Sequence, residues 1–108
     1  MQTSEPRFVA SSELLWLKTD GSEVVVTARV GIPYQTDENE HRCAVEIVGF
    51  DGRYSDMAGA SSLQALSLAI GLLATRLEDL LKEGGRLVYP DDRSIDWDSE
   101  SLKSLFGR

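Results

Sequence analysis

The sequence predicts an α+β fold, in which an antiparallel β-meander of four to five strands carries one long helix on one face and a short C-terminal helix follows. Two Asp-Gly pairs separate apolar runs rich in β-branched residues, as in antiparallel hairpins. One stretch, about residues 63–83, instead repeats its apolar residues at helical spacing. The 108 residues fit a single domain, 1–108, in which residues 1–7 are expected to form a loose arm.

The first hairpin is predicted from residues 12–18 and 23–30. Asp20-Gly21 joins them, and a type I′ turn favours this pair because both central positions need positive φ. Alternation along the second run places four apolar residues on one face: Val24, Val26, Ala28 and Val30. This strand should end at Gly31-Ile32-Pro33, because proline has no N–H to donate to a ladder.

The second hairpin follows a polar loop at residues 34–41. Residues 42–50 predict a third strand, with Cys43, Val45 and Ile47 on a common face. Asp51-Gly52 is the next turn signal, and residues 53–58 should form a short fourth strand that pairs back.

The long helix is predicted from about Leu63 to Lys82 or Glu83. Ser61 or Ser62 can cap its N-terminus, and Gly84-Gly85 should end it. Its apolar residues recur at positions 63, 66, 70, 73, 77 and 80, while Leu68 and Leu72, with Ala65 and Ala69, widen the stripe. So wide a stripe needs cover on a second side, either from the C-terminal segment or from a partner.

The C-terminal segment should begin with a short fifth strand at residues 86–89, which Pro90 ends. Residues 91–98 are polar and acidic. Ser99 can then cap a final helix over residues 100–106, whose apolar edge contains Leu102, Leu105 and Phe106.

The charge is strongly acidic, because 18 Asp and Glu outnumber 11 Lys and Arg to give a net −7. Such a chain repels nucleic acid and anionic membrane surfaces, so neither is expected as a partner. A basic protein surface is the natural electrostatic partner, although acidity also serves solubility alone. No apolar run reaches the roughly 20 residues of a membrane span, and the N-terminus lacks the pattern of a signal peptide. We therefore expect a cytoplasmic protein.

Motifs for catalysis or metal binding are weak. The single cysteine, Cys43, lies two positions from the single histidine, His41, so a thiol–imidazole pair is conceivable, but buried free cysteine is the more common case. A calcium loop starting at Asp96 fails, because its sixth position is Ser101 and its twelfth is Gly107. Phosphate-loop and dinucleotide motifs are also missing. We expect no enzyme, no metal and no cofactor.

Acidic residues concentrate in two segments, and these are the predicted protein-binding residues. Trp97 lies between two carboxylates, which fits a binding hot spot with an aromatic anchor and a charged surround. Alternatively, Trp97 folds back to cover the wide helix. The predicted contacts are Asp37, Glu38 and Glu40 in the first segment, and Asp91, Asp92, Asp96, Trp97 and Asp98 in the second.

A family resemblance rests on three motifs: Gly31-Ile32-Pro33 after the valine strand, the run from Cys43 to Gly49, and the helix start Ser62-Leu63-Gln64-Ala65-Leu66. Over about residues 10–90 the chain resembles a small bacterial single-domain family of unknown function. The family pattern Gly-x-Asp-Ser is replaced by Gly59-Ala60-Ser61-Ser62, so the acid is absent here.

Some members of that family resemble immunity proteins encoded beside secreted toxins. The resemblance implies a cytoplasmic immunity protein that covers the active cleft of a cognate toxin with an acidic surface. The alternative is a homodimeric, non-catalytic housekeeping or chaperone-like module that pairs through Leu68 and Leu72.

Overall fold

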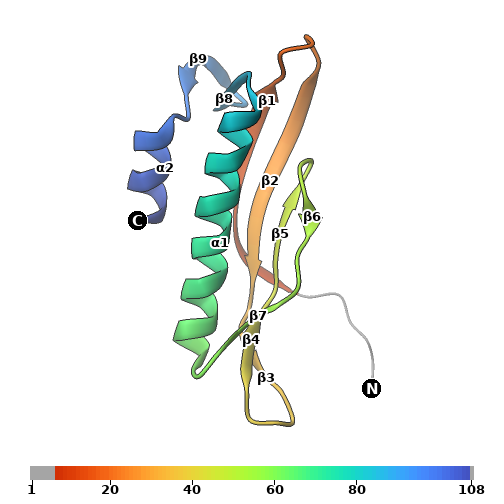
Figure 1. Cartoon of the computed structure of the whole chain (residues 1–108), viewed down its shortest axis with the longest axis vertical. Helices are drawn as coiled ribbons and strands as arrows, with labels where there is room; N and C mark the ends of the chain where they lie inside the picture. Colours follow the sequence, from red (N-terminus) through yellow and green to blue (C-terminus); the bar gives the residue numbers. More distant parts are fainter. Residues whose placement is uncertain (1–6, 108) are drawn as a thin grey trace.

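The computed structural model describes residues 7–107, which form one long helix, one short helix and short to medium strands (Figure 1). Of the predicted arm at residues 1–7, all but Arg7 lie outside the described residues. In chain order the elements are β1 (Phe8–Leu17), β2 (Glu23–Gly31), β3 (Tyr34–Gln35), β4 (His41–Cys43), β5 (Val45–Val48), β6 (Gly52–Arg53), β7 (Met57–Gly59), α1 (Ser62–Glu83), β8 (Arg86–Tyr89), β9 (Asp92–Asp96) and α2 (Ser99–Phe106).

The main sheet has six strands in the order β6-β5-β2-β1-β8-β9, and every pairing in it is antiparallel. α1 lies along one face of this sheet, and α2 packs against α1 (Figure 1). The predicted α+β fold is confirmed. The first four predicted strands form the expected meander, and the fifth, β8, is placed on the other side of β1.

A second, three-stranded sheet has the order β3-β4-β7 and was not expected. The predicted third strand breaks at Ala44 into β4 and β5, and the predicted fourth into β6 and β7. The Gly31 N–H donates to the Ala44 carbonyl at 2.8 Å, which is the last bond between β2 and this chain segment. Because β2 ends at Gly31, β4 extends past it and pairs with β3 and β7 instead.

The core lies between the main sheet and α1. Trp16 lies in this core, and the Nε1–H of its buried ring donates to the Gly84 carbonyl at 3.1 Å. The ring also meets Phe50 edge to face, at 5.8 Å between centroids. The inward residues predicted for the second and third strands are buried, apart from Val24, which is half-buried: Val26, Ala28, Val30, Cys43, Val45 and Ile47.

α1 begins and ends as predicted, with the Ser61 side chain accepting from the Gln64 N–H and Gly84 closing the helix. Its buried stripe differs at the N-terminal end, where Ala65 and Ala69 face the sheet and Leu63 is 75% exposed. The helix approaches β7 closely there, since a Cβ on Gly59 would lie 2.7 Å from the Ala65 nitrogen. Small side chains are required at this contact, and the alanines supply them. Because Leu63 is exposed, the prediction that it belongs to the buried stripe is wrong.

The C-terminal segment is more ordered than the sequence predicts. Residues 92–96, expected as part of a polar stretch, form β9. Arg93 of β9 forms a two-pronged ion pair with Glu23 of β2, although β1 and β8 lie between these strands in the sheet. This ion pair therefore links the edge strand β9 to β2 across two intervening strands. Among the described residues, no helix is long and apolar enough to cross a membrane.

Candidate binding surface

The end of the molecule formed by β8, β9 and α2 gathers aromatic and acidic side chains. Tyr89 at the end of β8 stacks on Trp97, which precedes α2, at 4.8 Å between ring centroids and 36° between planes. Trp97 is half-buried against the core, and its backbone N–H donates to the Leu87 carbonyl at 2.6 Å. Trp97 therefore folds back onto the protein while part of its ring remains at the surface.

A shallow depression lies beside this aromatic pair. Its lining includes Tyr89, Trp97, Glu100 and Leu105. Leu105 is 43% exposed, and Ile95 on the neighbouring strand is 47% exposed. These apolar groups were not predicted as binding residues. The helical spacing of Leu102, Leu105 and Phe106 placed Leu105 on the apolar edge of the helix. It did not show that only Leu102 of these three would be fully buried.

Two of the four acids predicted at this end accept hydrogen bonds from neighbouring serines. Asp98 caps α2 by accepting from the Ser101 N–H at 2.9 Å, and this bond lowers its pKa. Asp92 accepts from the hydroxyl and the N–H of Ser94, and its pKa is lowered by these two bonds. The cap is therefore Asp98 rather than the predicted Ser99, and α2 begins one residue earlier than expected.

The remaining two acids at this end differ from each other. Asp96 pairs with Arg86 across the β8–β9 ladder. Asp91 lies exposed in the turn between β8 and β9, and no ion pair involving it is formed with the other described residues. The carboxylates of Asp91 and Glu100 are thus available to a partner.

The first acidic segment forms the turn between β3 and β4. Asn39 adopts the left-handed conformation, with φ at 68°, and its N–H donates to the Thr36 carbonyl at 3.0 Å. Glu40 forms an ion pair with Arg42 at 2.7 Å. Asp37 and Glu38 remain exposed at the tip of the turn.

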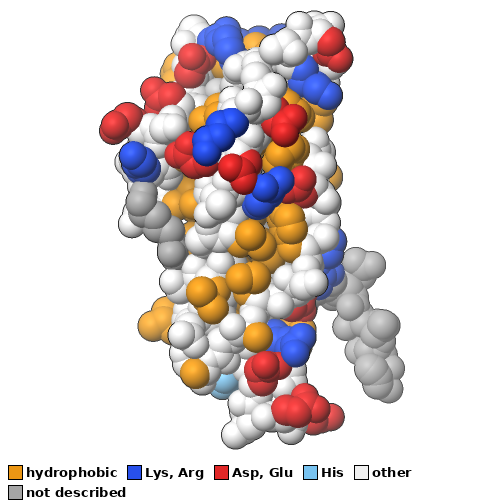
Figure 2. All heavy atoms as spheres, viewed as in Figure 1, with side chains coloured by type: hydrophobic (Ala, Val, Ile, Leu, Met, Phe, Trp, Pro, Cys, Tyr) orange, Lys and Arg blue, Asp and Glu red, His pale blue; other side chains and the backbone are white. Residues whose placement is uncertain are grey.

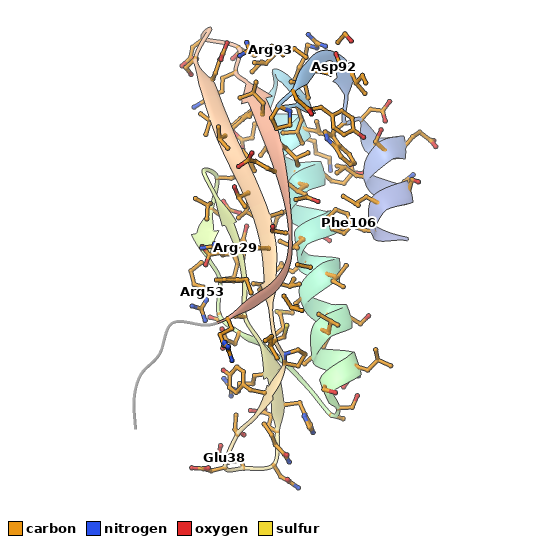
Figure 3. The ribbon with its side chains drawn as sticks, turned by 180° about the vertical axis from the view of Figure 1, so that it is seen from behind. Arg29, Glu38, Arg53, Asp92, Arg93 and Phe106 are labelled. Atoms are coloured by element: carbon orange, nitrogen blue, oxygen red, sulfur yellow. The ribbon has the colours of Figure 1, made fainter. Side chains whose placement is uncertain are left out.

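The eight predicted contacts do not form one face. Glu38 lies at one end of the molecule and Asp92 at the opposite end (Figure 3), and the longest dimension is 46 Å. An interface of ordinary size buries about 800 Å² on each partner, a patch roughly 30 Å across. One such interface cannot contain both segments, so the prediction divides into two separate acidic surfaces.

The face occupied by α1 has a different character. Apolar side chains gather over the middle of this face, with charged side chains toward its ends (Figure 2). Leu68 is 41% exposed, whereas Leu72 is half-buried and packs against the core. Leu72 therefore offers less surface for a dimer contact than the sequence predicts, and Leu63 offers more.

The His41 and Cys43 pair takes no catalytic geometry. Cys43 is fully buried, and its Sγ–H donates to the Gly31 carbonyl at 3.3 Å. Burial raises the pKa of this thiol, which is the opposite of the activation that a nucleophile needs. Within residues 7–107, no three His, Cys, Asp or Glu side chains lie close enough to hold a metal ion.

The family model described as a domain of unknown function, DUF6968, matches residues 12–100. The chain belongs to this family. The match spans most of the domain, from β1 to the start of α2, and confirms the resemblance to a family of unknown function. Comparison with the curated proteins and with the solved structures finds no match.

Proposed function

We propose that this DUF6968 chain is a non-catalytic immunity protein that binds a secreted bacterial toxin and covers its active cleft. One observation carries the proposal: a half-buried aromatic pair, Tyr89 and Trp97, adjoins exposed aliphatic groups, with Asp91 and Glu100 nearby. This composition, an aromatic centre with charges around it, is typical of the residues that dominate protein binding energies. We name it the β9–α2 surface: Tyr89, Asp91, Ile95, Trp97, Glu100 and Leu105.

The charge of the chain supports a basic partner. Many toxins that act on nucleic acids have basic clefts, because their substrates carry phosphate. A net charge of −7 accelerates association with such a surface. The resemblance described in the sequence analysis implies the same class of partner.

The β9–α2 surface is preferred to the β3–β4 turn for a physical reason. Both present free carboxylates, but at the turn Asp37 and Glu38 lie at the tip of a two-residue strand pair. Trp97 is instead fixed by its stack and by its backbone bond to Leu87. A preorganised aromatic group binds without losing further side-chain entropy, so it contributes more to affinity.

The test is to capture proteins of the producing bacterium on the full chain, identify a toxin, and measure its dissociation from variants. Trp97→Ala should increase the dissociation rate by about tenfold or more, whereas Asp91→Lys should mainly slow association at low salt. Glu38→Lys is the matched charge control at the opposite end. If Glu38→Lys weakens binding and Trp97→Ala does not, the β9–α2 surface is not the contact. If deletion of the gene causes no self-intoxication and no toxin is captured, the immunity function is refuted.

A homodimeric housekeeping or chaperone-like module is the second candidate. The exposure of Leu63 and Leu68 on one half of α1 favours it. Sedimentation of the full chain tests this function: a tight dimer that Leu68→Glu dissociates supports it, and a monomer at all concentrations excludes it.

A further inference from the structure

β1 is paired along its whole length on one side only. Its ladder with β2 runs from Phe8 to Leu17, whereas β8 pairs only with residues 15–17. Backbone bonds alternate along an antiparallel pair, and Lys18 donates to Ser22 across the same hairpin. Residues 10, 12, 14 and 16 of β1 therefore bond to β2, and the N–H and C=O groups of Ser11 and Glu13 face the other way. No strand among residues 7–107 pairs with them there.

An apolar groove of about 200 Å³ lies beside this free edge. Ser12 pairs with Ala28, and these two small side chains follow the larger pair Leu14 and Val26 along the same face of the sheet. This change from large to small side chains leaves the space that forms the groove. The opposite wall includes Leu105 and Phe106 of α2, and Figure 3 shows Phe106 on the side of α2 that faces the sheet.

The groove and the edge together specify an occupant. Free backbone donors and acceptors on an edge pair with an extended chain, and the groove accepts aliphatic side chains from every second residue of that chain. An apolar cavity of about 150 Å³ holds a molecule as large as benzene, so 200 Å³ accommodates one or two branched aliphatic side chains. The added strand would continue the line of β8, whose Leu87 is buried opposite Trp16.

The strands of this chain do not match that occupant. β1 itself contributes Ala10, Ser11 and Ser12 to the groove, and these side chains are too small to fill it in a second copy. The edge strands of the main sheet are β6, which is Gly52–Arg53, and β9, which has Asp or Arg at three of its five positions. Glu13 is exposed on the opposite face of β1 and forms no ion pair with the described residues, so it favours a basic side chain in the strand beside it.

We propose that the free edge of β1 at residues 10–14 binds an extended segment of another protein as an added antiparallel strand, with aliphatic residues in the groove and basic residues near Glu13. A bulge between Phe8 and Ala10 limits the pairing to this stretch. The inference does not require that the partner is a toxin, and it concerns backbone recognition rather than the β9–α2 surface.

The probe is a short acetylated, amidated peptide in which leucine or valine alternates with lysine and threonine. Binding to the full chain is followed by amide NMR shifts and by hydrogen exchange. We expect the amides of Ser11 and Glu13 to exchange at least tenfold more slowly at saturating peptide. A peptide of the same composition with a central proline is the control and should give no such protection.

Two variants separate strand pairing from simple apolar contact. Ser11→Pro removes an outward N–H that β2 does not use, so the fold is retained while peptide binding falls about tenfold. Ser11→Ala is its matched control and should bind within twofold of the unaltered chain. If Ser11→Pro unfolds the protein, Ser12→Leu replaces it, because leucine fills the hollow from within and should weaken binding similarly.

Three outcomes overturn the proposal. In the first, the amides of Ser11 and Glu13 remain unprotected with the peptide at millimolar concentration. In the second, the peptide changes the NMR shifts of groove side chains without protecting these amides, which means that the groove is an apolar ligand site. Protection that depends on protein concentration without any peptide means that a second copy occupies the edge.

Discussion

Gly49 and Gly21 have the same φ of 91°, but only Gly49 lies against another strand. A Cβ added at Gly49 would lie 2.3 Å from the Val25 carbonyl oxygen, whereas at Gly21 no atom lies within 4 Å. The pair therefore separates the cost of the backbone conformation from the cost of the contact. Replacing each glycine with alanine measures the two terms.

The conformational cost is common to both variants. A non-glycine residue at positive φ costs about 1–2 kcal/mol, and Gly21→Ala should lose this amount of unfolding free energy. At Gly49 the ordinary carbon–oxygen contact of about 3.3 Å requires a shift of about 1 Å against a carbonyl held in the sheet. Overpacking of this kind costs about 1–3 kcal/mol. Gly49→Ala should therefore lose about 2–5 kcal/mol in total.

Urea unfolding of the full chain, followed by tryptophan fluorescence and circular dichroism, measures both losses. The slope of free energy against urea should be unchanged, since neither variant alters the surface exposed on unfolding. Equal losses for Gly49→Ala and Gly21→Ala would refute the reasoning, because the close approach of Gly49 to Val25 would then carry no energy.

Three further predictions concern the core and its charges. The Arg76 guanidinium lowers the pKa of Asp51 below that of a free aspartate, so the stability from this pair is present above the unfolded-state pKa and is lost as pH falls through the folded-state pKa. Asp51→Asn should therefore flatten the acid limb of the unfolding midpoints measured against pH. Leu77→Ala should cost about 2–5 kcal/mol in urea unfolding, while Leu68→Ala on the exposed side of α1 should cost less than about 1 kcal/mol; equal costs would contradict the assigned burial. Cys43 should react with a thiol reagent only on unfolding, so its labelling rate should rise steeply with urea, and rapid labelling in buffer would be inconsistent with its burial.

The elements set by local chemistry are those that the sequence predicts well. The α1 helix depends on a serine cap, a helical apolar period and a glycine stop, all within its own residues. The β1–β2 hairpin similarly follows from Asp20-Gly21 and the alternating valines, and its inward face is the predicted one. In each case the signal and the structure lie in the same stretch of chain.

The features that the sequence misses depend on contacts between distant segments. β9 is a strand because its backbone pairs with β8, and Arg86 and Glu23 form ion pairs with its charged residues. None of these partners can be recognised from residues 91–98 alone. The break at Ala44 follows from the length of β2, not from any break signal in residues 42–50. The two acidic segments lie at opposite ends of the molecule because of the strand topology. The number of charges in the sequence does not show how far apart they lie.

α2 links the two proposed binding regions, because Leu105 lines both the depression beside Trp97 and the groove beside β1. Leu105→Glu should therefore weaken toxin binding at the β9–α2 surface and peptide binding at the β1 edge. Trp97→Ala should affect only the first, and Ser11→Pro only the second. Leu105 is 43% exposed, so the variant should keep its fold, which the urea unfolding midpoint checks. If Leu105→Glu weakens neither interaction at an unchanged midpoint, Leu105 contacts neither partner, and the proposed position of both partners against α2 is wrong.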